Sequence, residues 1–391
     1  MVVIAKYFSN NKTISCRLVA VWLLLLGLIS YSNLQSQTNI SLKDTLDNKL
    51  DLSDFVVNLH GFVPMPVIIS EPALGNFGIA MALVFISPKK KLKGEKRYHF
   101  PDITAAAGLY TANKSWGAAL FRQGSFPSLG LRYRAAIGYT NLNLNFYRET
   151  LATGEMDFDI NLAPALAMLD ISKNIYRDKY FVGTNYLFSN VKVNYDFTDN
   201  LYPYIDQSEF NKNLSTLALY GEYDGRNSIF TPDRGIRFKG SYTVGRSFIG
   251  SDFNTDKLSA YTNAFIQPVE WWICGLKGEW QWIDEGAPFY YYPFIIMRGI
   301  PVLRYQGKQT LLFETEQRID LNLRWSLIGF VGSGKAYSNS KYVGDNDWHW
   351  AGGAGFRYLI ARVFKLRIGL DIATGPDQFA YYIVFGHYWN R

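Results

Sequence analysis

The sequence predicts an all-β protein, a transmembrane antiparallel β-barrel of about 16 strands with an inward-folded loop between strands 11 and 12. Three observations lead to this prediction. Short runs of alternating apolar and polar residues recur along the chain, aromatic residues make up 16% of its 391 residues, and an apolar leader opens it. A closed barrel is the form in which a sheet can span lipid, because it leaves no backbone edge unpaired.

The N-terminal segment has the three sections of a secretory signal peptide. Basic residues come first, then an apolar run, then small and polar residues: Lys6, Lys12 and Arg17, followed by 18–29 and by 30–37. The apolar run, about a dozen residues, is too short for a comfortable spanning helix. We therefore expect residues 1–36 to be removed, an uncleaved anchor being the alternative. Cys274 is then the one cysteine left, so no intrachain disulfide forms.

Residues 37–60 are polar and short of aromatics, with aspartates at 44, 47, 51 and 54. We interpret them as a short periplasmic lead-in, flexible or weakly helical, and residues 61–391 as the outer-membrane β-barrel. Residues 62–75 read as a turn region before the first strand. Strand-like runs then follow to the end of the chain, at 77–85, 103–110, 115–121, 131–139, 142–147, 156–168, 180–195, 214–223, 236–244, 258–266, 271–282, 311–321, 325–331, 350–359, 364–372 and 379–389.

The run at 311–321 shows the alternation most clearly. Its odd positions include Leu311, Phe313, Ile319 and Leu321, and its even positions from 314 on are Glu314, Glu316, Arg318 and Asp320. Successive side chains of a strand point to opposite faces. One face therefore suits lipid, and the other suits a polar barrel interior. Tryptophan and tyrosine near strand ends are typical of interfacial girdles, as at 271–272, 280–282, 348–350 and 388–389.

Composition argues against several classes of function. The net charge of +7 belongs partly to the leader and partly to a basic run at 89–97, which reads as a solvated loop, and we find no nucleic-acid module. The four histidines are scattered without metal-ligand spacing, so we expect no metal, no cofactor and no catalytic residues. We predict that the protein is not an enzyme, although an outer-membrane lipase or acyltransferase stays open, because catalytic groups need be close only in space.

Several motifs together resemble the BamA/TamA-type outer-membrane protein family, also called the bacterial surface antigen family. Met297, Arg298, Gly299 and Ile300 look like its Val-Arg-Gly-Phe loop motif, and Glu316 to Arg318 like its glutamate-any-arginine strand. The stretch at 353–357 and the run at 379–389 are similar to its last strands. The stretch from 224 to 235 is similar to the family's periplasmic turn motif, carried here by Asp224, Arg226, Phe230, Pro232 and Gly235.

The resemblance implies that Arg298 latches an inward loop to lumenal partners among Glu314, Glu316 and Arg318; a plain stabilising salt bridge is the alternative. It also implies two departures. Residues 37–60 cannot hold a POTRA domain, so this would be a short member lacking POTRA domains. Gly332 stands where the family has an aspartate, so Arg298 is expected to lack one partner.

Two functions remain open. As an assembly factor for insertion or translocation of proteins at the bacterial outer membrane, the barrel would open between the strand at Phe77 and the strand at Phe379, because unpaired strand edges accept further strands. Its partners would be outer-membrane lipid, unfolded outer-membrane proteins and a periplasmic accessory protein, with no nucleic acid. As a channel or transporter, it would instead pass solute through a charged lumen. Few hydrogen bonds between the terminal strands would favour the first.

Overall fold

The computed structural model describes residues 41–58, 61–75, 77–87, 102–150, 154–195, 210–337, 346–376 and 378–389. The chain divides into two compact units, Met1–Ser41 and Leu42–Arg391, and the fold below is that of the second unit. The predicted signal peptide and the basic run at 89–97 lie outside the described residues.

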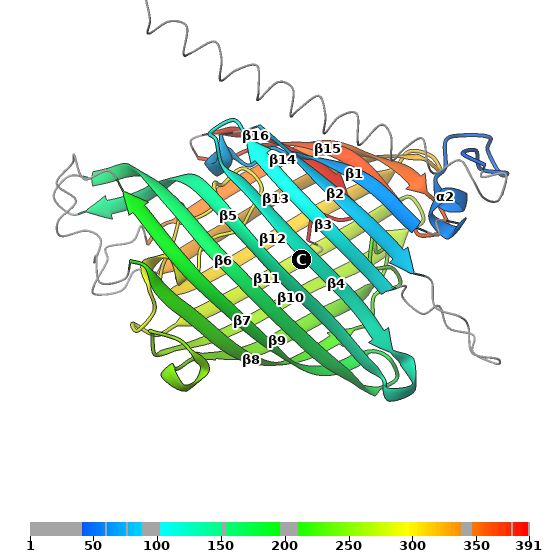
Figure 1. The fold of residues 1–391 in the computed structure, drawn as a ribbon. Helices are drawn as coiled ribbons and strands as arrows, with labels where there is room; N and C mark the ends of the chain where they lie inside the picture. The colour runs from blue at the N-terminus through cyan, green and yellow to red at the C-terminus, as the bar shows by residue number, and fades with distance from the viewer. Residues whose placement is uncertain are drawn as a thin grey trace, which may run out of the picture. The chain divides into compact units, whose positions relative to one another are not determined.

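Sixteen strands form one antiparallel sheet in which each strand pairs with the next in the chain. The sheet curls into a nearly closed barrel, which confirms the predicted fold class (Figure 1). The strands are β1 (Gly61–Ile69), β2 (Gly78–Ser87), β3 (Asp102–Thr111), β4 (Trp116–Phe126), β5 (Leu131–Thr150), β6 (Gly154–Tyr176), β7 (Tyr180–Tyr195), β8 (Lys212–Asp224), β9 (Gly235–Gly245), β10 (Thr255–Val269), β11 (Trp272–Ile283), β12 (Gln309–Asp320), β13 (Trp325–Tyr337), β14 (Trp348–Ala361), β15 (Leu366–Thr374) and β16 (Phe379–Phe385).

The predicted strand number is right, but two errors in the prediction cancel. Residues 61–69, predicted as part of a turn region, form β1, and the runs at 131–139 and 142–147, predicted as two strands, form the single strand β5. β1 was not predicted as a strand because it contains Pro64 and Pro66, and proline is rare inside strands. The polar residue Asn141, between the two predicted runs, made β5 look like two strands. In the barrel its side chain accepts a hydrogen bond from Asn161 at 2.7 Å.

The outer face of the barrel is apolar because each strand turns its apolar positions away from the interior. On β12, Phe313 and Ile319 are 54% and 39% exposed, while Glu314 and Glu316 are 3% and 4% exposed. Of the predicted girdle residues, tryptophans 271, 272, 348 and 350 are exposed, whereas Trp280, Trp282 and Tyr388 are half-buried. Trp389 is buried. It is 1% exposed, so its assignment to a girdle is wrong.

Helical segments in the described residues are short: α2 (Ser53–Asn58) and the 3-10 turns η1 (Pro72–Leu74), η2 (Pro127–Leu129), η4 (Ser247–Ile249) and η5 (Phe289–Tyr291). None of the helices in this part of the chain is long and apolar enough to cross a membrane. The 3-10 turns η1, η2 and η4 each close a connection through a left-handed glycine, for example Gly75 with φ 83° after η1.

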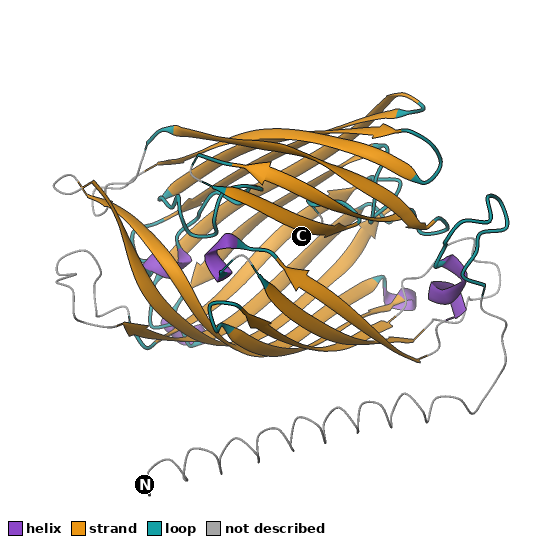
Figure 2. Ribbon diagram, turned by 90° about the horizontal axis from the view of Figure 1, so that it is seen from above, coloured by secondary structure: helices purple, strands orange, loops and turns teal. Residues whose placement is uncertain are grey.

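The first and last strands lie side by side without a hydrogen-bonded ladder. Figure 2 views the barrel along a direction at right angles to Figure 1. Within residues 61–69 and 379–385, β1 pairs with β2 and β16 pairs with β15, and no pairing joins β1 to β16. We call this boundary the seam. It was predicted between the strand at Phe77 and that at Phe379; its first partner is wrong, because β2 after Phe77 is paired on both edges, to β1 and β3.

An even number of antiparallel strands places the start of β1 and the end of β16 on the same rim of the barrel. We call it the terminal rim. It carries the connections at 225–234, 321–324 and 362–365, whereas the connections at 70–77 and 284–308 belong to the opposite rim.

Candidate functional site

The connection between β11 and β12, residues 284–308, folds into the barrel interior. We call it the inward loop. An antiparallel bridge between Phe294 and Gln306 closes its base. Its tip is held by apolar packing in which loop residues meet inward-facing residues of β12, β13 and β14, namely Ile295, Met297 and Ile300 against Leu312, Ala336 and Ala351. Each of these side chains is 4% exposed or less, so the tip is part of the core.

Arg298, at the tip, contacts three carboxylates from two strands. Its Nη2 lies 2.8 Å from Glu314 Oε1 and 2.7 Å from Glu316 Oε2, and its Nη1 lies 2.6 Å from Asp371 Oδ2 on β15. The Arg298 side chain is 0% exposed. Charge-assisted pairs of this kind are the stronger hydrogen bonds of proteins, and removing one partner leaves an uncompensated buried charge.

Two further cations complete the group. Arg357 on β14 holds Asp371 through both terminal nitrogens, at 2.5 and 2.9 Å, and Lys277 on β11 lies 3.9 Å from Glu314. We call these six residues the central ion cluster: Arg298, Glu314, Glu316, Asp371, Arg357 and Lys277. Lys277 also lies 3.4 Å from Glu279. The cluster ties the inward loop to β11, β12, β14 and β15.

Aromatic rings fix the plane of the Arg298 guanidinium. Its Cζ lies 3.5 Å from the ring centroid of Phe330 on β13 and 4.7 Å from that of Tyr388, which follows β16. Both separations are within cation–π range. A lysine at position 298 would keep the charge but would lose the planar group that these rings and three carboxylates hold.

The expectation that Arg298 lacks a partner is wrong, because a different strand supplies it. Gly332 does stand in β13 opposite the loop, but Asp371 on β15 provides the third carboxylate. A Cβ on Gly332 would lie 2.4 Å from Met297 Sδ and 2.9 Å from the carbonyl oxygen of Phe313. Gly332 therefore makes the space that Met297 fills, and an aspartate there is incompatible with this packing.

Gly332→Asp is accordingly expected to destabilise the barrel by about 1–3 kcal/mol through overpacking, with a further cost from a fourth carboxylate beside Glu314. The measurement is the temperature at which the folded form disappears on a gel in mild detergent. Gly329→Ala on the same strand is the matched control, since nothing lies within 4 Å of its added Cβ. Equal melting of the two variants would contradict the packing argument.

The inward loop also contacts both sides of the seam. The backbone N–H of Gly299 donates to Tyr382 Oη on β16 at 3.0 Å, and the N–H of Val302 donates to Glu71 Oε1 in the β1–β2 connection at 3.2 Å. Gly299 adopts φ 87°, and its Cα approaches the backbone of Thr374 and Gly375 where a Cβ would lie 3.0–3.1 Å away. The loop, and not a strand ladder, therefore links the two edges.

A second apolar cluster closes the interior toward the opposite rim. Residues of the inward loop and the β1–β2 connection pack there on the extended ends of β5, β6 and β7: Phe289 and Leu303, Ala73, and Leu144, Ile160, Leu162, Val191 and Val193. The Phe289 side chain is 2% exposed. The loop thus spans the interior from the ion cluster to the far wall.

The predicted turn motif shapes the β8–β9 connection. Arg226 binds the carboxylate of Asp224 through Nε at 2.9 Å and Nη2 at 2.8 Å. Gly235 has φ 112°, and a Cβ there would lie 2.4 Å from the carbonyl oxygen of Gly225, so only glycine fits. Pro232 is buried, whereas Phe230 is 38% exposed.

This connection does more than reverse the chain, since it folds over the terminal rim. Asp233 contacts Arg318 on β12 and Lys365 in the β14–β15 connection. Arg318 also holds Asp320 at 3.0 Å. Of the predicted lumenal partners, Glu314 and Glu316 meet Arg298, while Arg318 instead fastens the β8–β9 connection.

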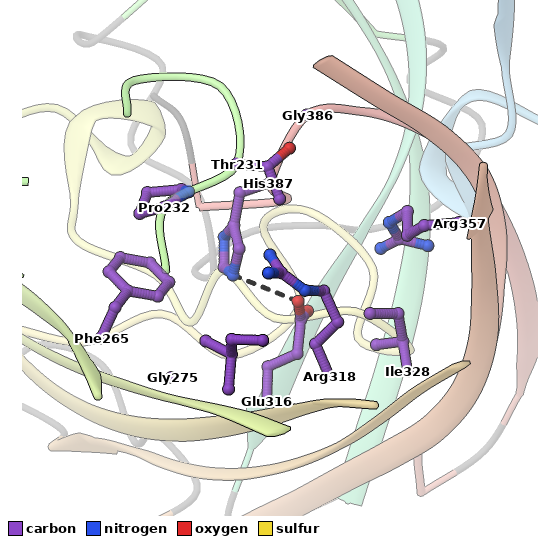
Figure 3. A pocket seen from close by; sticks show the side chains of 11 residues that line it. Thr231, Pro232, Phe265, Gly275, Glu316, Arg318, Ile328, Arg357, Gly386 and His387 are labelled. Atoms are coloured by element: carbon purple, nitrogen blue, oxygen red, sulfur yellow. Dashed lines mark ion pairs between the residues drawn. The ribbon is translucent and has the colours of Figure 1, made fainter. Parts of the chain in front are cut away.

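The residues after β16 turn inward at Gly386, which has φ 75°. His387 Nε2 lies 3.1 Å from Glu316 Oε1, and Tyr261 Oη on β10 donates to the Trp389 carbonyl oxygen at 2.8 Å. The prediction that the last strand runs to Trp389 is therefore wrong, and β16 ends at Phe385. Figure 3 shows His387 and Glu316 in a pocket lined also by Thr231, Pro232, Phe265, Gly275, Arg318, Ile328 and Arg357.

The lead-in, predicted to be flexible or weakly helical, contains the short helix α2, and ion pairs fasten its residues 42–53 to the barrel. We call these residues the strap. Arg324, in the β12–β13 connection, binds three aspartates: Nη2 to Asp44 at 2.5 Å, Nε to Asp47 at 2.6 Å and Nη1 to Asp51 at 2.6 Å. Arg362, in the β14–β15 connection, binds Asp44 at 2.5 Å. Three of the regularly spaced aspartates are thus held by two arginines, and we call these contacts the clamp.

Backbone contacts extend the strap toward β1. The N–H of Leu52 donates to the Ile360 carbonyl oxygen at 2.6 Å, and the N–H of Val363 donates to Ser53 Oγ at 3.1 Å. Helix α2 begins at Ser53, and β1 begins at Gly61. The strap, which precedes β1 in the chain, is therefore fastened at the terminal rim to the end of β14 and to the β14–β15 connection.

The strap should be released by acid. A hydrogen bond from Arg362 lowers the pKa of Asp44 to about 2, against the effect of burial, and a hydrogen bond from Arg324 lowers the pKa of Asp47. Burial raises the pKa of Asp51, but hydrogen bonds from Ser53 and Arg324 outweigh it and the net pKa is lowered. Carboxyls with depressed folded pKa values stabilise above the unfolded pKa, about 4, and lose that stabilisation as pH falls toward the folded value.

We therefore expect the amides of residues 44–53 to keep slow hydrogen exchange, after correction for intrinsic rates, from pH 7 to about 5 and to lose it between about pH 4 and 2. Asp44→Asn should speed this exchange already at pH 7. Asp54→Asn is the control, because Asp54 is exposed on the same segment. Protection that stays constant down to pH 2 would contradict the clamp.

The described ranges contain no group of three or more histidine, cysteine, aspartate or glutamate side chains that could hold a metal ion. His387 is bound to Glu316, and His349 stacks on Tyr305 with ring centroids 3.5 Å apart.

Several residues of the site were missed from the sequence. Asp371 lies in the strand run predicted at 364–372, yet nothing in the chain connects it to Arg298, 73 positions away. No sequence pattern indicates that Tyr382 and Glu71 contact the inward loop. The aspartates of the strap were noticed as a spacing, but their arginine partners lie more than 270 residues later.

Comparisons with known proteins identify the fold. No protein-family model and no curated protein sequence matches the chain. Among solved structures, BamA from Haemophilus ducreyi lacking POTRA domains 1-3 aligns with a TM-score of 0.53 and 12% identity, covering 83% of this chain and 69% of that one. CdiB from Escherichia coli aligns with a TM-score of 0.60 and 10% identity, again over 83% of this chain, which spans 62% of CdiB. At these identities the likeness is one of barrel architecture.

Proposed function

We propose that this chain is an outer-membrane β-barrel that opens at the β1–β16 seam to insert or translocate polypeptide at that membrane. The observation that carries the proposal is the seam itself. Residues 61–69 and 379–385 run side by side with no ladder between them, in a sheet where all fifteen other neighbouring pairs are hydrogen-bonded. Opening this boundary breaks no strand pairing.

Each edge of the seam is also anchored on its own. β1 is held through the strap to Arg324 and Arg362, and β16 is held through its following residues to Glu316 and Tyr261. Parting the edges therefore leaves both anchors in place. What must move is the inward loop, whose contacts at Gly299 and Val302 join the two sides.

The apolar outer surface of the barrel supports the proposed location in a membrane. The exposed apolar positions of the strands face lipid, and the likeness to BamA and CdiB supports an outer-membrane location by analogy of fold. The proposed partners are an unfolded outer-membrane protein and an accessory protein in the periplasm. A steady solute channel is the competing function, and the inward loop, buried in the interior between the ion cluster and the far wall, disfavours it.

The test measures insertion of an unfolded barrel protein into liposomes, with and without this protein, alongside ion conductance of the same liposomes. In a background with Cys16 and Cys274 replaced by serine, Ile68→Cys is combined with Phe379→Cys, since both positions lie on the outer face near the opposite rim, at the end of β1 and the start of β16. We expect acceleration in the reduced protein, its loss after oxidation, and little conductance. Steady conductance without acceleration would replace this function by the channel.

A further inference from the structure

An arginine stands on the outer wall of the barrel among apolar neighbours. The outward positions of β4 are Trp116, Ala118, Leu120, Arg122, Gly124 and Phe126. Arg122 is the one charged residue among them, and its side chain is 49% exposed. A charge that faces lipid is costly at the middle of a bilayer and costs little near its surface. Because Arg122 lies close to the end of β4 at the terminal rim, its surroundings are those of lipid headgroups.

Two hydroxyl groups from neighbouring strands hold the Arg122 guanidinium. Its Nη1 donates to Thr104 Oγ1 on β3 at 2.6 Å, and its Nε donates to Tyr133 Oη on β5 at 3.2 Å. Thr104 is directly opposite Arg122 in the β3–β4 register. The strands β3 to β6 lie side by side in the sheet (Figure 1). The hydroxyls fix the plane of the guanidinium without neutralising it, because both are uncharged acceptors.

The nearest carboxylate is more distant. Asp102 Oδ2 lies 3.9 Å from Arg122 Nη2, which is beyond hydrogen-bond distance, and Asp102 Oδ1 accepts the Ser125 N–H at 3.3 Å. Nη2 of Arg122 makes no hydrogen bond to the residues that the structure describes. It is therefore a positioned donor that faces the outside of the barrel.

A second cation lies on the same part of the wall. Lys173 on β6 is exposed and is paired with Leu131, the first residue of β5. Tyr133 is its diagonal neighbour across the strands, at a separation that a long side chain spans. Arg122 and Lys173 thus flank Tyr133, and their two positive charges outnumber the single negative charge of Asp102.

A glycine makes room for this arrangement. Tyr133 stacks on Phe126 with ring centroids 5.5 Å apart. A Cβ on Gly124 would lie 2.6 Å from Tyr133 Oη and 2.7 Å from Asp102 Oδ1. Glycine at position 124 therefore leaves the space through which Tyr133 reaches Arg122. Tyrosine is enriched where a membrane meets water, because its ring suits lipid and its hydroxyl suits polar groups.

Apolar side chains continue the wall from this group toward the middle of the barrel. Leu120 on β4 and Ile137 on β5 are opposite each other and are 53% and 55% exposed. Leu169 on β6 is 46% exposed. A lipid whose headgroup contacts Arg122 can lay its acyl chains on these three residues, whereas a free phosphate ion would meet the polar groups alone.

We propose that the outer wall of β3 to β6 binds one phospholipid at the terminal rim through the phosphate of its headgroup. Arg122 Nη2 donates to a phosphate oxygen, Lys173 adds positive charge, and Thr104 and Tyr133 position the guanidinium. Arginine suits this role because its planar group forms charge-assisted hydrogen bonds with phosphate. The site does not depend on opening of the seam. Failure to insert substrate in the liposome assay would remove the function proposed above and leave this site standing.

The test is native mass spectrometry of the full chain, released from detergent micelles to which phosphatidylglycerol has been added. Arg122→Gln should weaken binding of the first lipid roughly tenfold or more, because it removes a charge-assisted hydrogen bond. Arg234→Gln is the matched control. Arg234 is also exposed at the terminal rim, but it lies in the β8–β9 connection and donates to Gln267 at 3.0 Å, so its replacement should leave lipid binding unchanged.

Tyr133→Phe tests the positioning of Arg122 with its charge intact. It keeps the stack on Phe126 and removes the hydroxyl that accepts from Arg122 Nε, so binding should weaken severalfold. The melting temperature on the gel checks that each variant is folded. If Arg122→Gln does not fold, the Tyr133→Phe measurement decides the question.

Two further ligands show what the site recognises. Diacylglycerol with the same acyl chains lacks the phosphate and should bind at least about tenfold more weakly than phosphatidylglycerol. Inorganic phosphate lacks the acyl chains and should not displace the lipid at equal concentration. Equal binding of diacylglycerol, displacement by inorganic phosphate, or unchanged lipid binding by folded Arg122→Gln or Tyr133→Phe would each overturn the proposal.

Discussion

Arg298→Ala is expected to lower the free energy of unfolding by about 3–5 kcal/mol, the usual cost of breaking a buried ion pair from one side. The substitution leaves Glu314, Glu316 and Asp371 buried with two cations for three carboxylates, and their side chains are 0%, 4% and 0% exposed. The folded form should disappear at a clearly lower temperature in the gel assay. Trypsin should also reach the inward loop at Arg304 and Lys308.

Lys308→Ala in the same loop is the matched control for melting. Lys308 pairs with Glu285 at 3.2 Å, but the two side chains are 31% and 56% exposed, so the pair contributes about 0–1 kcal/mol at most. The melting temperature of Arg298→Lys should fall between those of Arg298→Ala and Lys308→Ala. If Arg298→Ala melts like Lys308→Ala and its loop resists trypsin, the loop is held by its apolar packing alone and the latch hypothesis fails.

Asp371→Ala is the second change with a large expected effect, again about 3–5 kcal/mol. It removes one carboxylate from two guanidiniums at once, Arg298 at 2.6 Å and Arg357 at 2.5 and 2.9 Å. Both arginines stay buried and charged, because a guanidinium does not deprotonate in a protein. Loop protection and the melting temperature should therefore fall together.

Asp102→Ala is the comparison for this variant. Asp102 also pairs with an arginine from the adjacent strand and accepts a hydrogen bond from the Ser125 N–H, but the ion pair is 3.9 Å long and the Arg122 side chain is 49% exposed, so the expected change is smaller than for Asp371→Ala. The double variant Arg298→Ala with Asp371→Ala should cost less than the sum of the two single changes, because each removes the other's uncompensated partner. Strict additivity would show that the two residues act independently.

These two variants also bear on the seam. The central ion cluster holds the loop residue next to Gly299, and Gly299 and Val302 contact the two edges. A loop released from the cluster should let the edges part more readily. In the liposome assay, therefore, Arg298→Ala is expected to insert substrate faster at first and to inactivate sooner, since the same change weakens the barrel.

Part of this protein was predictable from local sequence. Alternation in 311–321 placed Glu314, Glu316 and Arg318 on the inward face, because side-chain direction in a strand depends only on position parity. The inward loop and the turn motif at 224–235 were implied by the resemblance to a known family, and within the turn glycine and proline impose backbone angles over a few residues. The strand at 61–69 was missed by the same reasoning. Proline argues against a strand in general, and only the position of β1 at the edge of the sheet makes two prolines acceptable.

What the sequence by itself determined is the barrel, most of its strands and the faces they present, because these depend on alternation and turns between near neighbours. The tertiary structure alone decided which charges meet. Asp371 rather than a residue at 332 completes the Arg298 site, Asp44 and Asp51 find Arg324 across the chain, and Trp389 lies inside the barrel instead of at its surface. Ion pairs and close packing depend on distances of a few ångström between residues far apart in the chain, and closure of the barrel sets those distances.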